Sequence, residues 1–260
     1  MPDVTAELRD HIATVTLDRP PVNAVTTATF VELRDVFGVL GEDRDVRVAI
    51  LTAAGTKAFM AGVDLKTVDD RGPLDELPPA LVLDRGRVAR DAMWAIIDCP
   101  VPVIGAINGP ALGAGLAFAA CCDILVAAEG ARFGTTEINV GLLGASAHLS
   151  LLVGRHKARE MFFTGEQVSA EELHRLGAVR AVVPADELAG TARALASELA
   201  AKSPIALRLA KESMNRVENL PLRDAYRTEQ DYTARLLAFE DAAEARRAFM
   251  ERREPDFRWR

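Results

Sequence analysis

An uncharged stretch at residues 99–122 constrains the fold more than any other part of the chain. With the aspartate that follows, it is CPVPVIGAINGPALGAGLAFAACCD. Its length fits a transmembrane helix, but three prolines and four glycines would break one, and leucine, isoleucine and phenylalanine are too sparse for a lipid-facing helix. The pattern instead predicts a buried strand over residues 101–107, a tight Gly-Pro turn, and an alanine-rich helix starting near Gly113.

The turn before this predicted helix is a candidate binding site. Its small residues allow the backbone to approach another group closely, and a helix start leaves unpaired N–H groups. Such groups favour an oxygen that carries or develops negative charge. We therefore hypothesise that the turn supplies half of an oxyanion hole. A buried strand–turn–helix corner without function is the alternative interpretation.

The composition is that of a globular protein without a nucleic-acid partner. The 260 residues are enough for one large core, and the formal net charge is −7, with no dominant basic block. The first ten residues, MPDVTAELRD, lack the features of a secretory signal. The three cysteines show neither a disulfide framework nor metal-ligand spacing. We expect a cytoplasmic protein with no metal site, no membrane segment and no nucleic-acid partner.

Hydrophobic periodicity predicts an α/β core, residues 1–190, followed by a helical region, residues 191–260. Residues 67–79 are polar and broken by proline, so we expect a mobile segment over a site. The chain after residue 186 is helical by pattern, with interruptions at Pro204 and Pro221. Strands are predicted at residues 4–8, 12–17, 46–52, 101–107, 124–128 and 179–183. Helices are predicted from residue 26 or 27 to residue 40, at 81–97, from 113, at 149–163 and from 169.

Three segments, taken in their order and spacing, carry a family resemblance. They are AFMAGVDLK at residues 58–66, NGPALGAGLAFAACCD at 108–123 and FGTTEINVGLLG at 133–144. They resemble the crotonase family, the enoyl-CoA hydratase/isomerase group, and the similarity extends from RPPVNA at residues 19–24 to Phe257 and Arg258. The resemblance implies a crotonase-like spiral of ββα turns with a C-terminal helical trimerisation region, in agreement with the α/β core predicted above.

The resemblance also implies a catalytic centre. The backbone N–H groups of Val63 and Ala114 would form the oxyanion hole for the carbonyl of an acyl-CoA thioester, in agreement with the hypothesis for the helix start. Such a pair stabilises the enolate that forms when a proton leaves or joins the carbon next to the thioester. Glu137 matches a family acid/base, and its apolar flanking residues predict a pKa raised by desolvation.

Further positions match substrate-binding positions of the family. Lys66 would lie near the CoA phosphates or adenine, and Phe257 with Arg258 would contact CoA from a neighbouring subunit. Simpler roles stay open for three residues. Asp64 is alternatively a helix cap, and Lys66 a solvated lysine. His148 is alternatively a residue that caps or packs the following helix instead of a partner for Glu137, water or the acyl chain. The full set is Ala61, Val63, Asp64, Leu65, Lys66, Ala114, His148, Phe257 and Arg258.

One position departs from the family's hydratase pattern. Hydratases usually have two glutamates, and the first matches Ala117, which cannot transfer a proton. Two carboxylates suit hydration, because one activates water while the other supplies a proton. A single carboxylate, Glu137, suits a Δ3–Δ2 double-bond shift, in which one base removes a proton and returns it two carbons away. Hydratase, isomerase, 3-hydroxyacyl-CoA dehydratase or lyase, and a catalytically silent acyl-CoA-binding protein all stay open.

The resemblance implies that coenzyme A is part of the substrate, a fatty or related acyl-CoA, and that no further cofactor is needed. It also implies a homotrimer or a dimer of trimers. No pattern in the chain predicts the length, branching or stereochemistry of the acyl group.

Overall fold

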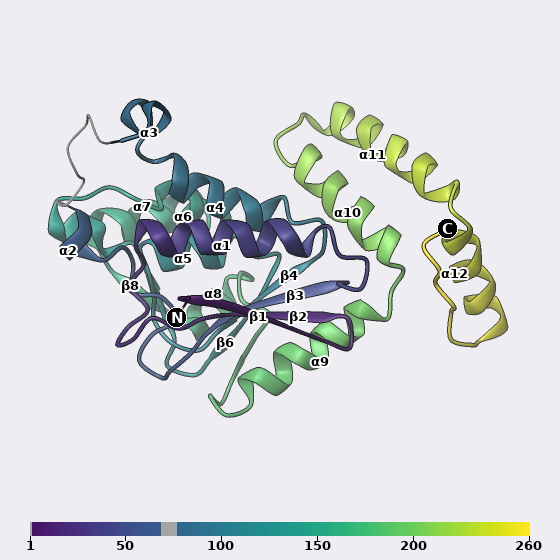
Figure 1. Cartoon of the computed structure of the whole chain (residues 1–260), viewed down its shortest axis with the longest axis horizontal. Coiled ribbons are helices and arrows are strands. Elements are labelled where there is room, and N and C mark those ends of the chain that lie inside the picture. Colours follow the sequence, from purple (N-terminus) through teal and green to yellow (C-terminus); the bar gives the residue numbers. More distant parts are fainter. Residues whose placement is uncertain (1, 69–76) are drawn as a thin grey trace.

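The computed structural model describes residues 2–68 and 77–260 and contains two β-sheets surrounded by helices (Figure 1). The larger sheet has six strands in the order β1-β2-β3-β4-β6-β9, and the smaller has three in the order β5-β7-β8. In the larger sheet β1 and β2 are antiparallel and the other neighbours are parallel. The strands are β1 Val4–Arg9, β2 Ile12–Leu17, β3 Val48–Ala53, β4 Val103–Ile107, β5 Ala111–Leu112, β6 Ile124–Ala128, β7 Arg132–Gly134, β8 Gln167–Ser169 and β9 Ala181–Val183.

The helices follow most of the predicted positions. The strand and helix predicted within the uncharged stretch are confirmed as β4 and α5. The helices are α1 Thr27–Leu40, α2 Leu65–Val68, α3 Pro79–Leu83, α4 Arg87–Ile97, α5 Ala114–Cys121, α6 Ser146–Leu152, α7 Arg155–Thr164, α8 Ala170–Arg175, α9 Leu188–Ala200, α10 Pro204–Val217, α11 Leu222–Leu237 and α12 Glu240–Glu251, with a 3-10 helix, η2, at Thr136–Val140.

Helices cover both faces of the larger sheet because its central strands are apolar on both faces. All five side-chain positions of β4 are buried, and so are five of the six in β3. On one face α1, α4 and α5 enclose the main core, which includes Leu33, Ile96 and Phe118. On the other face α9 packs against the sheet through Ala192 and Ala196 (Figure 1).

Two of the predicted helices are wrong in extent, because each is two helices. The pattern over residues 81–97 is split into α3 and α4, since Asp84 has a backbone outside the helical region and its carboxylate pairs with Arg90. The pattern over residues 149–163 is split into α6 and α7, since Val153 and Gly154 are extended. Because the apolar periodicity continues through both breaks, the sequence pattern does not indicate them. The predicted mobile segment falls largely on residues 69–76, outside the described residues.

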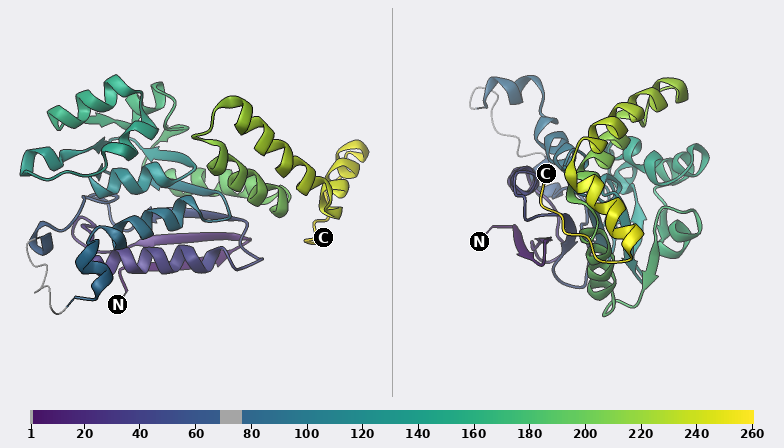
Figure 2. Two further views of the ribbon diagram at one scale, coloured as in Figure 1. Left: turned by 90° about the horizontal axis from the view of Figure 1, so that it is seen from above. Right: turned by 90° about the vertical axis from the view of Figure 1, so that its right-hand side faces the viewer.

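The C-terminal helices reach away from one end of the molecule. α9 lies on the sheet, whereas α10, α11 and α12 follow one another away from it (Figures 1 and 2). Pro204 and Pro221 stand at the starts of α10 and α11, as predicted. The boundary predicted at residue 190 falls inside α9, and the division into two regions stays a prediction.

Two basic side chains, the buried Lys211 and the half-buried Arg208, attach α10 to the core. Lys211, which is 5% exposed, donates hydrogen bonds to the carbonyl oxygens of Ile96 (3.1 Å) and Val101 (3.2 Å) and to Oδ2 of Asp123 (2.7 Å). Arg208 donates to backbone carbonyls of residues 41, 43 and 46. One lysine therefore joins α10, the end of α4 and the residue that precedes β6.

None of the helices in residues 2–68 and 77–260 has the length and apolar character that a bilayer crossing requires.

Candidate active site

The N-terminus of α5 presents backbone N–H groups at a glycine-lined corner. Gly113 is the N-cap with a φ of 54°, and no side chain caps the helix. A β-carbon added to Gly115 would overlap the carbonyl oxygen of Met60, so only glycine allows α5 to lie this close to the preceding segment. Ala114 is the first residue of the helix, where an N–H has no partner within the helix.

The segment that carries Val63 runs beside this corner. The backbone N–H of Met60 donates to the carbonyl of Pro110 (3.2 Å), and the carbonyl of Met60 accepts from the N–H of Leu112 (2.9 Å). These two bonds form a parallel β-bridge between Met60 and Ala111. The segments still run side by side two residues further on, because a β-carbon added to Gly62 would lie 3.3 Å from the carbonyl oxygen of Leu112. The two amides predicted to form the oxyanion hole therefore come from neighbouring segments.

The other side of the Val63 segment is already paired. Val25 donates to the carbonyl of Gly62 (2.9 Å) and accepts from the N–H of Asp64 (2.9 Å). Because both neighbours of Val63 bond to Val25, the N–H of Val63 points to the opposite side of the segment. Within residues 2–68 and 77–260, neither the N–H of Val63 nor that of Ala114 donates a hydrogen bond.

Glu137 lies against the same corner. A β-carbon added to Gly113 would be 2.7 Å from Oε1 of Glu137, and one added to Gly144 would be 2.8 Å from it. The carboxylate is thus enclosed by glycine backbone, and Gly113 directly precedes Ala114. The 3-10 helix η2 holds Glu137 in place, since its carbonyl accepts from the N–H of Leu142 (3.0 Å).

The electrostatic environment of Glu137 suits proton transfer. Oε2 is buried, and no group of the described residues bonds to it. Burial raises the pKa of Glu137 and outweighs the opposing effect of its own backbone N–H. The predicted direction and the predicted cause, desolvation, are confirmed, but the flanking Ile138 and Val140 are exposed, and glycine backbone lies against the carboxylate instead. A carboxyl whose pKa is raised holds its proton more tightly than an ordinary carboxyl, which suits a group that both takes up and gives back a proton.

Ala117 adds no second carboxylate to the corner. It lies one turn along α5 from Gly113, and its N–H donates to the carbonyl of Gly113 (3.1 Å). The methyl group is 1% exposed and belongs to the apolar interior of α5. Position 117 therefore supplies no proton-transfer group.

Asp64 has the capping geometry that the sequence allowed. Its Oδ1 accepts from the backbone N–H of Lys66 (3.1 Å), and its Oδ2 accepts from Arg19 (3.1 Å). The Lys66 N–H, with the guanidinium of Arg19, lowers the pKa of Asp64 below its ordinary value. Leu65 and Lys66 are exposed on α2, and the N–H of Ala61 bonds to the carbonyl of Val22 (3.2 Å).

His148 lies on α6, four residues after Gly144. Its side chain is half-buried, and burial lowers its pKa, which favours the neutral imidazole near neutral pH. No hydrogen bond joins His148 to the residues that the structure describes. Its suggested role beside Glu137 stays a prediction.

Phe257 and Arg258 lie far from this corner of their own chain (Figures 1 and 2). They follow α12, and the C-terminus and α2 lie at opposite ends of the molecule in two perpendicular views (Figures 1 and 2). Arg258 pairs with Asp256, and its backbone N–H donates to Asp241 (2.9 Å). Contact between this pair and the corner requires a second subunit.

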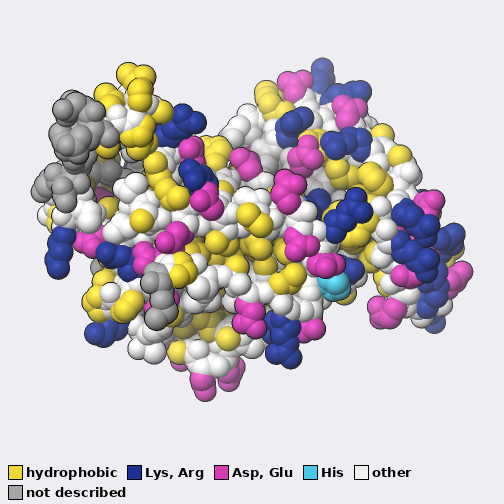
Figure 3. All heavy atoms as spheres, viewed as in Figure 1, with side chains coloured by type: hydrophobic (Ala, Val, Ile, Leu, Met, Phe, Trp, Pro, Cys, Tyr) yellow, Lys and Arg dark blue, Asp and Glu magenta, His cyan; other side chains and the backbone are white. Residues whose placement is uncertain are grey.

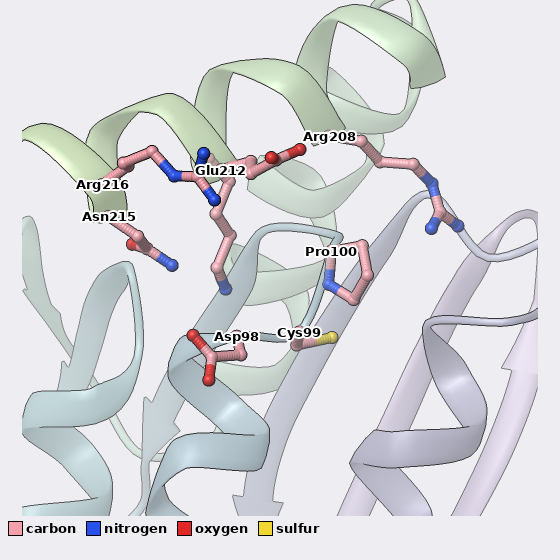
Figure 4. Close-up of a pocket in the computed structure, with 8 residues that line it drawn as sticks. Asp98, Cys99, Pro100, Arg208, Glu212, Asn215 and Arg216 are labelled. Carbon is pink, nitrogen blue, oxygen red and sulfur yellow. The ribbon is translucent and has the colours of Figure 1, made fainter. Parts of the chain in front are cut away.

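Two cavities lie away from the corner, beside α10. One of about 410 Å³ (Figure 4) is lined by Asp98, Cys99, Pro100, Arg208, Lys211, Glu212, Asn215 and Arg216. A larger one of about 730 Å³ lies between α10 and the end of α5 and includes Cys121, Cys122, Leu151 and Met214. Neither cavity is lined by Glu137, Val63 or Ala114. The candidate site is therefore defined by the carboxylate and the two backbone N–H groups of these residues and not by a cavity.

Comparison with known proteins places these observations in a family. The family model described as enoyl-CoA hydratase/isomerase matches residues 7–260. The chain belongs to the enoyl-CoA hydratase/isomerase family. A solved enoyl-CoA hydratase from Mycobacterium smegmatis has a TM-score of 0.90 at 35% identity and 99% coverage of both chains. The predicted crotonase-like fold is thereby confirmed.

Two curated relatives show the range of reactions within this family. A short-chain-enoyl-CoA hydratase from Clostridium acetobutylicum is 32% identical, over 96% of this chain and 95% of the relative. A (7aS)-7a-methyl-1,5-dioxo-2,3,5,6,7,7a-hexahydro-1H-indene-carboxyl-CoA hydrolase from Rhodococcus jostii is 38% identical, over 95% of this chain and 93% of the relative. The chain is thus an acyl-CoA enzyme of this family.

Proposed function

We propose that the enzyme moves a proton on an acyl-CoA thioester, with Glu137 as the single acid/base and the N–H groups of Val63 and Ala114 as the oxyanion hole. The observation that carries the proposal is the position of the Glu137 carboxylate against Gly113, the residue before Ala114. A proton-transfer group and an oxyanion donor then act on neighbouring atoms of one substrate.

In this mechanism the thioester carbonyl oxygen accepts both N–H groups. Glu137 removes a proton from the carbon next to the carbonyl, and the resulting enolate oxygen is stabilised by the two donors. Loss of one such donor typically costs about 10²–10³ in rate. Returning the proton two carbons away completes a Δ3–Δ2 double-bond shift with one carboxylate.

Hydration of a 2-enoyl-CoA is a second outcome for the same corner. It is supported by the hydratase relatives and requires a water beside the buried carboxyl of Glu137. Because Ala117 supplies no second carboxylate, His148 is the candidate partner for this water.

Hydrolysis of a ring-bearing acyl-CoA is a candidate from another reaction class. Two relatives, 38% and 37% identical, are named as hydrolases of a dioxo-hexahydroindene carboxyl-CoA. A single buried carboxyl with an unbonded Oε2 suits removal of a proton from a water that adds to a carbonyl carbon, while the oxyanion hole receives the carbonyl oxygen. When the carbonyl re-forms, the bond from that carbon to its leaving atom breaks, and Glu137 passes the proton to the leaving atom.

We further propose that coenzyme A enters only as part of the substrate, near Lys66, and that the enzyme is a homotrimer or a dimer of trimers. Apolar side chains on α11 and α12 are strongly exposed: Leu222 is 85%, Phe249 84% and Met250 81% exposed. Figure 3 shows hydrophobic surface among the charged side chains of these helices. A neighbouring subunit that covers them would also bring Phe257 and Arg258 toward another chain's site.

A paired assay tests the proposal. Wild type and Glu137→Gln are compared on crotonyl-CoA, 3-hexenoyl-CoA and a dioxo-hexahydroindene carboxyl-CoA, with products followed chromatographically. Conversion of 3-hexenoyl-CoA that is lost in Glu137→Gln supports the one-carboxylate isomerase, and turnover of either other substrate selects that reaction. Full activity of Glu137→Gln would contradict the role of Glu137. Binding of all three without turnover would indicate a specialised substrate or a binding protein.

A further inference from the structure

Two asparagine side chains hold the turn that leads from β3 to Val63. The Nδ2 group of Asn23 donates to the carbonyl oxygens of Ala54 (3.0 Å) and Ala58 (2.9 Å). The Nδ2 group of Asn108 donates to the carbonyls of Ala53 (2.8 Å) and Gly55 (2.9 Å). Both hydrogens of each amide are used, and each amide thereby ties two points of one turn.

The two asparagines come from different parts of the chain. Asn23 lies in the RPPVNA segment, and Asn108 begins the turn that leads to α5. Each therefore links the turn at residues 53–58 to one of the two segments beside Val63: the paired segment ending at Val25, and the segment ending at Ala114. Residues 54–58 lie in no strand, so the carbonyls of Ala54, Gly55 and Ala58 depend on these side chains.

Asn23 is built into this position. It is 3% exposed, its φ of 55° lies in the left-handed region that asparagine tolerates, and its Oδ1 accepts from the backbone N–H of Arg19 (2.9 Å). Arg19 also bonds to Asp64, the residue after Val63. Both ends of the segment that carries Val63 are thus attached to residues 19–25.

We propose that Asn23 and Asn108 are positioning residues that fix the N–H of Val63 in the oxyanion hole. The proposal rests on the proposed function, in which that N–H binds the thioester carbonyl. A displacement of about 1 Å at a reacting centre can cost about 10² in rate. Loss of the hydrogen bonds from either asparagine is therefore expected to lower kcat.

The experiment compares Asn23→Asp and Asn108→Ala with a control, Asn215→Asp. Aspartate keeps the shape of asparagine and cannot donate when ionised, so Asn23→Asp removes both bonds. Asn215, a half-buried asparagine on α10, donates to the carbonyl of Ile97 at the end of α4, away from the corner. Asn23→Gly is measured in parallel, because glycine adopts the left-handed backbone of residue 23 without strain. It provides a folded variant at this position if Asn23→Asp does not fold.

Three quantities are measured for each variant: kcat, KM and the infrared C=O stretch of the bound thioester. The proposal predicts that the Asn23 and Asn108 variants lose about 10- to 100-fold in kcat, with KM changed far less, and that the C=O frequency of the bound thioester moves back toward its value in solution. Asn215→Asp should lower the melting temperature without changing kcat or the C=O frequency.

The result that overturns the proposal is an unchanged kcat and an unchanged C=O frequency in the folded Asn23 and Asn108 variants. If these variants behave as predicted and Glu137→Gln keeps full activity, the role of Glu137 fails while the positioning proposal stands. If Glu137→Gln is inactive and the asparagine variants match wild type, the positioning proposal alone fails.

Discussion

At the scale of single residues, the chemistry of Glu137 comes from backbone and not from a charged neighbour. Gly113 and Gly144 enclose its carboxylate from two segments, and no donor among the described residues reaches Oε2. A side chain at either glycine would collide with the carboxylate. Substitution of either glycine would therefore displace the carboxylate from its present position.

The raised pKa of Glu137 makes stability depend on pH. Because the folded state holds this proton more tightly than the unfolded state, the stability linked to protonation is present at low pH and is lost as the pH rises through the folded pKa. Glutamine does not titrate, so the Glu137→Gln variant does not lose this stability as the pH rises. The melting temperature of the variant minus that of wild type is therefore expected to increase with pH, beginning near the ordinary pKa of 4.5.

Thermal melts of both proteins over a series of buffers check this expectation, and a difference that is constant with pH would contradict it. The activity of wild type should rise with pH along a limb centred above 4.5, because the base must be ionised.

At the scale of elements, the site depends on the close approach of α5 to the segment that carries Val63. Gly115 permits it, since a β-carbon there would overlap the Met60 carbonyl. Gly115→Ala is expected to lower the free energy of unfolding by about 1–3 kcal/mol and to reduce turnover, because α5 must shift from the corner. Denaturant melts and kcat measure the two effects.

Gly190→Ala is the matched control for this substitution. It replaces a glycine in a helix, α9, where a β-carbon meets nothing within 4 Å. It should raise the free energy of unfolding by about 0.5–1 kcal/mol without an effect on kcat. Equal effects of the two substitutions would show that α5 does not depend on close approach at Gly115.

The attachment of α10 depends on one buried lysine. Lys211→Met leaves Asp123 and two carbonyls without their partner, and breaking a buried pair costs about 3–5 kcal/mol. Because Asp123 is 31% exposed, the loss is expected near the lower end of that range. Arg227→Ala, which breaks an exposed pair on α11, should cost at most about 0.5 kcal/mol. Similar losses in both variants would contradict the role given to Lys211.

The elements of the core could be predicted because they repeat a pattern. β2, β6 and α1 lie within a residue or two of their predicted bounds, since apolar periodicity continues along each. The bridges of Val63 to Val25 and of Met60 to Ala111 involve single residues and leave no periodic signal. The sequence pattern likewise predicts no positioning role for Asn23 or Asn108. The available signal is that each asparagine lies in a turn within a segment that resembles the family.

At the scale of the whole molecule, the C-terminal helices expose apolar surface at the end opposite α2 (Figures 1 and 2). Phe257 and Arg258 lie at that end. A site completed by a neighbouring subunit accounts for both facts, and it links assembly to substrate binding.

The assembly can be measured directly. Light scattering is expected to give a mass about three or six times 28.0 kDa. Phe249→Asp, which places a charge on the exposed apolar surface of α12, should shift the mass toward one chain and raise KM for acyl-CoA. Arg246→Asp on the same helix is a control for added negative charge. A monomeric wild type with full activity would contradict the proposed assembly.

The central claim is that one carboxyl, Glu137, moves a proton beside an oxyanion hole. Its most direct test is exchange of the α-proton of an acyl-CoA thioester with deuterium from solvent, followed by mass spectrometry for wild type and Glu137→Gln. Wild type is expected to catalyse the exchange, and Glu137→Gln should lose about 10²–10⁴ in rate, the usual contribution of a general base, while still binding the thioester. Exchange at the wild-type rate in Glu137→Gln would contradict the claim.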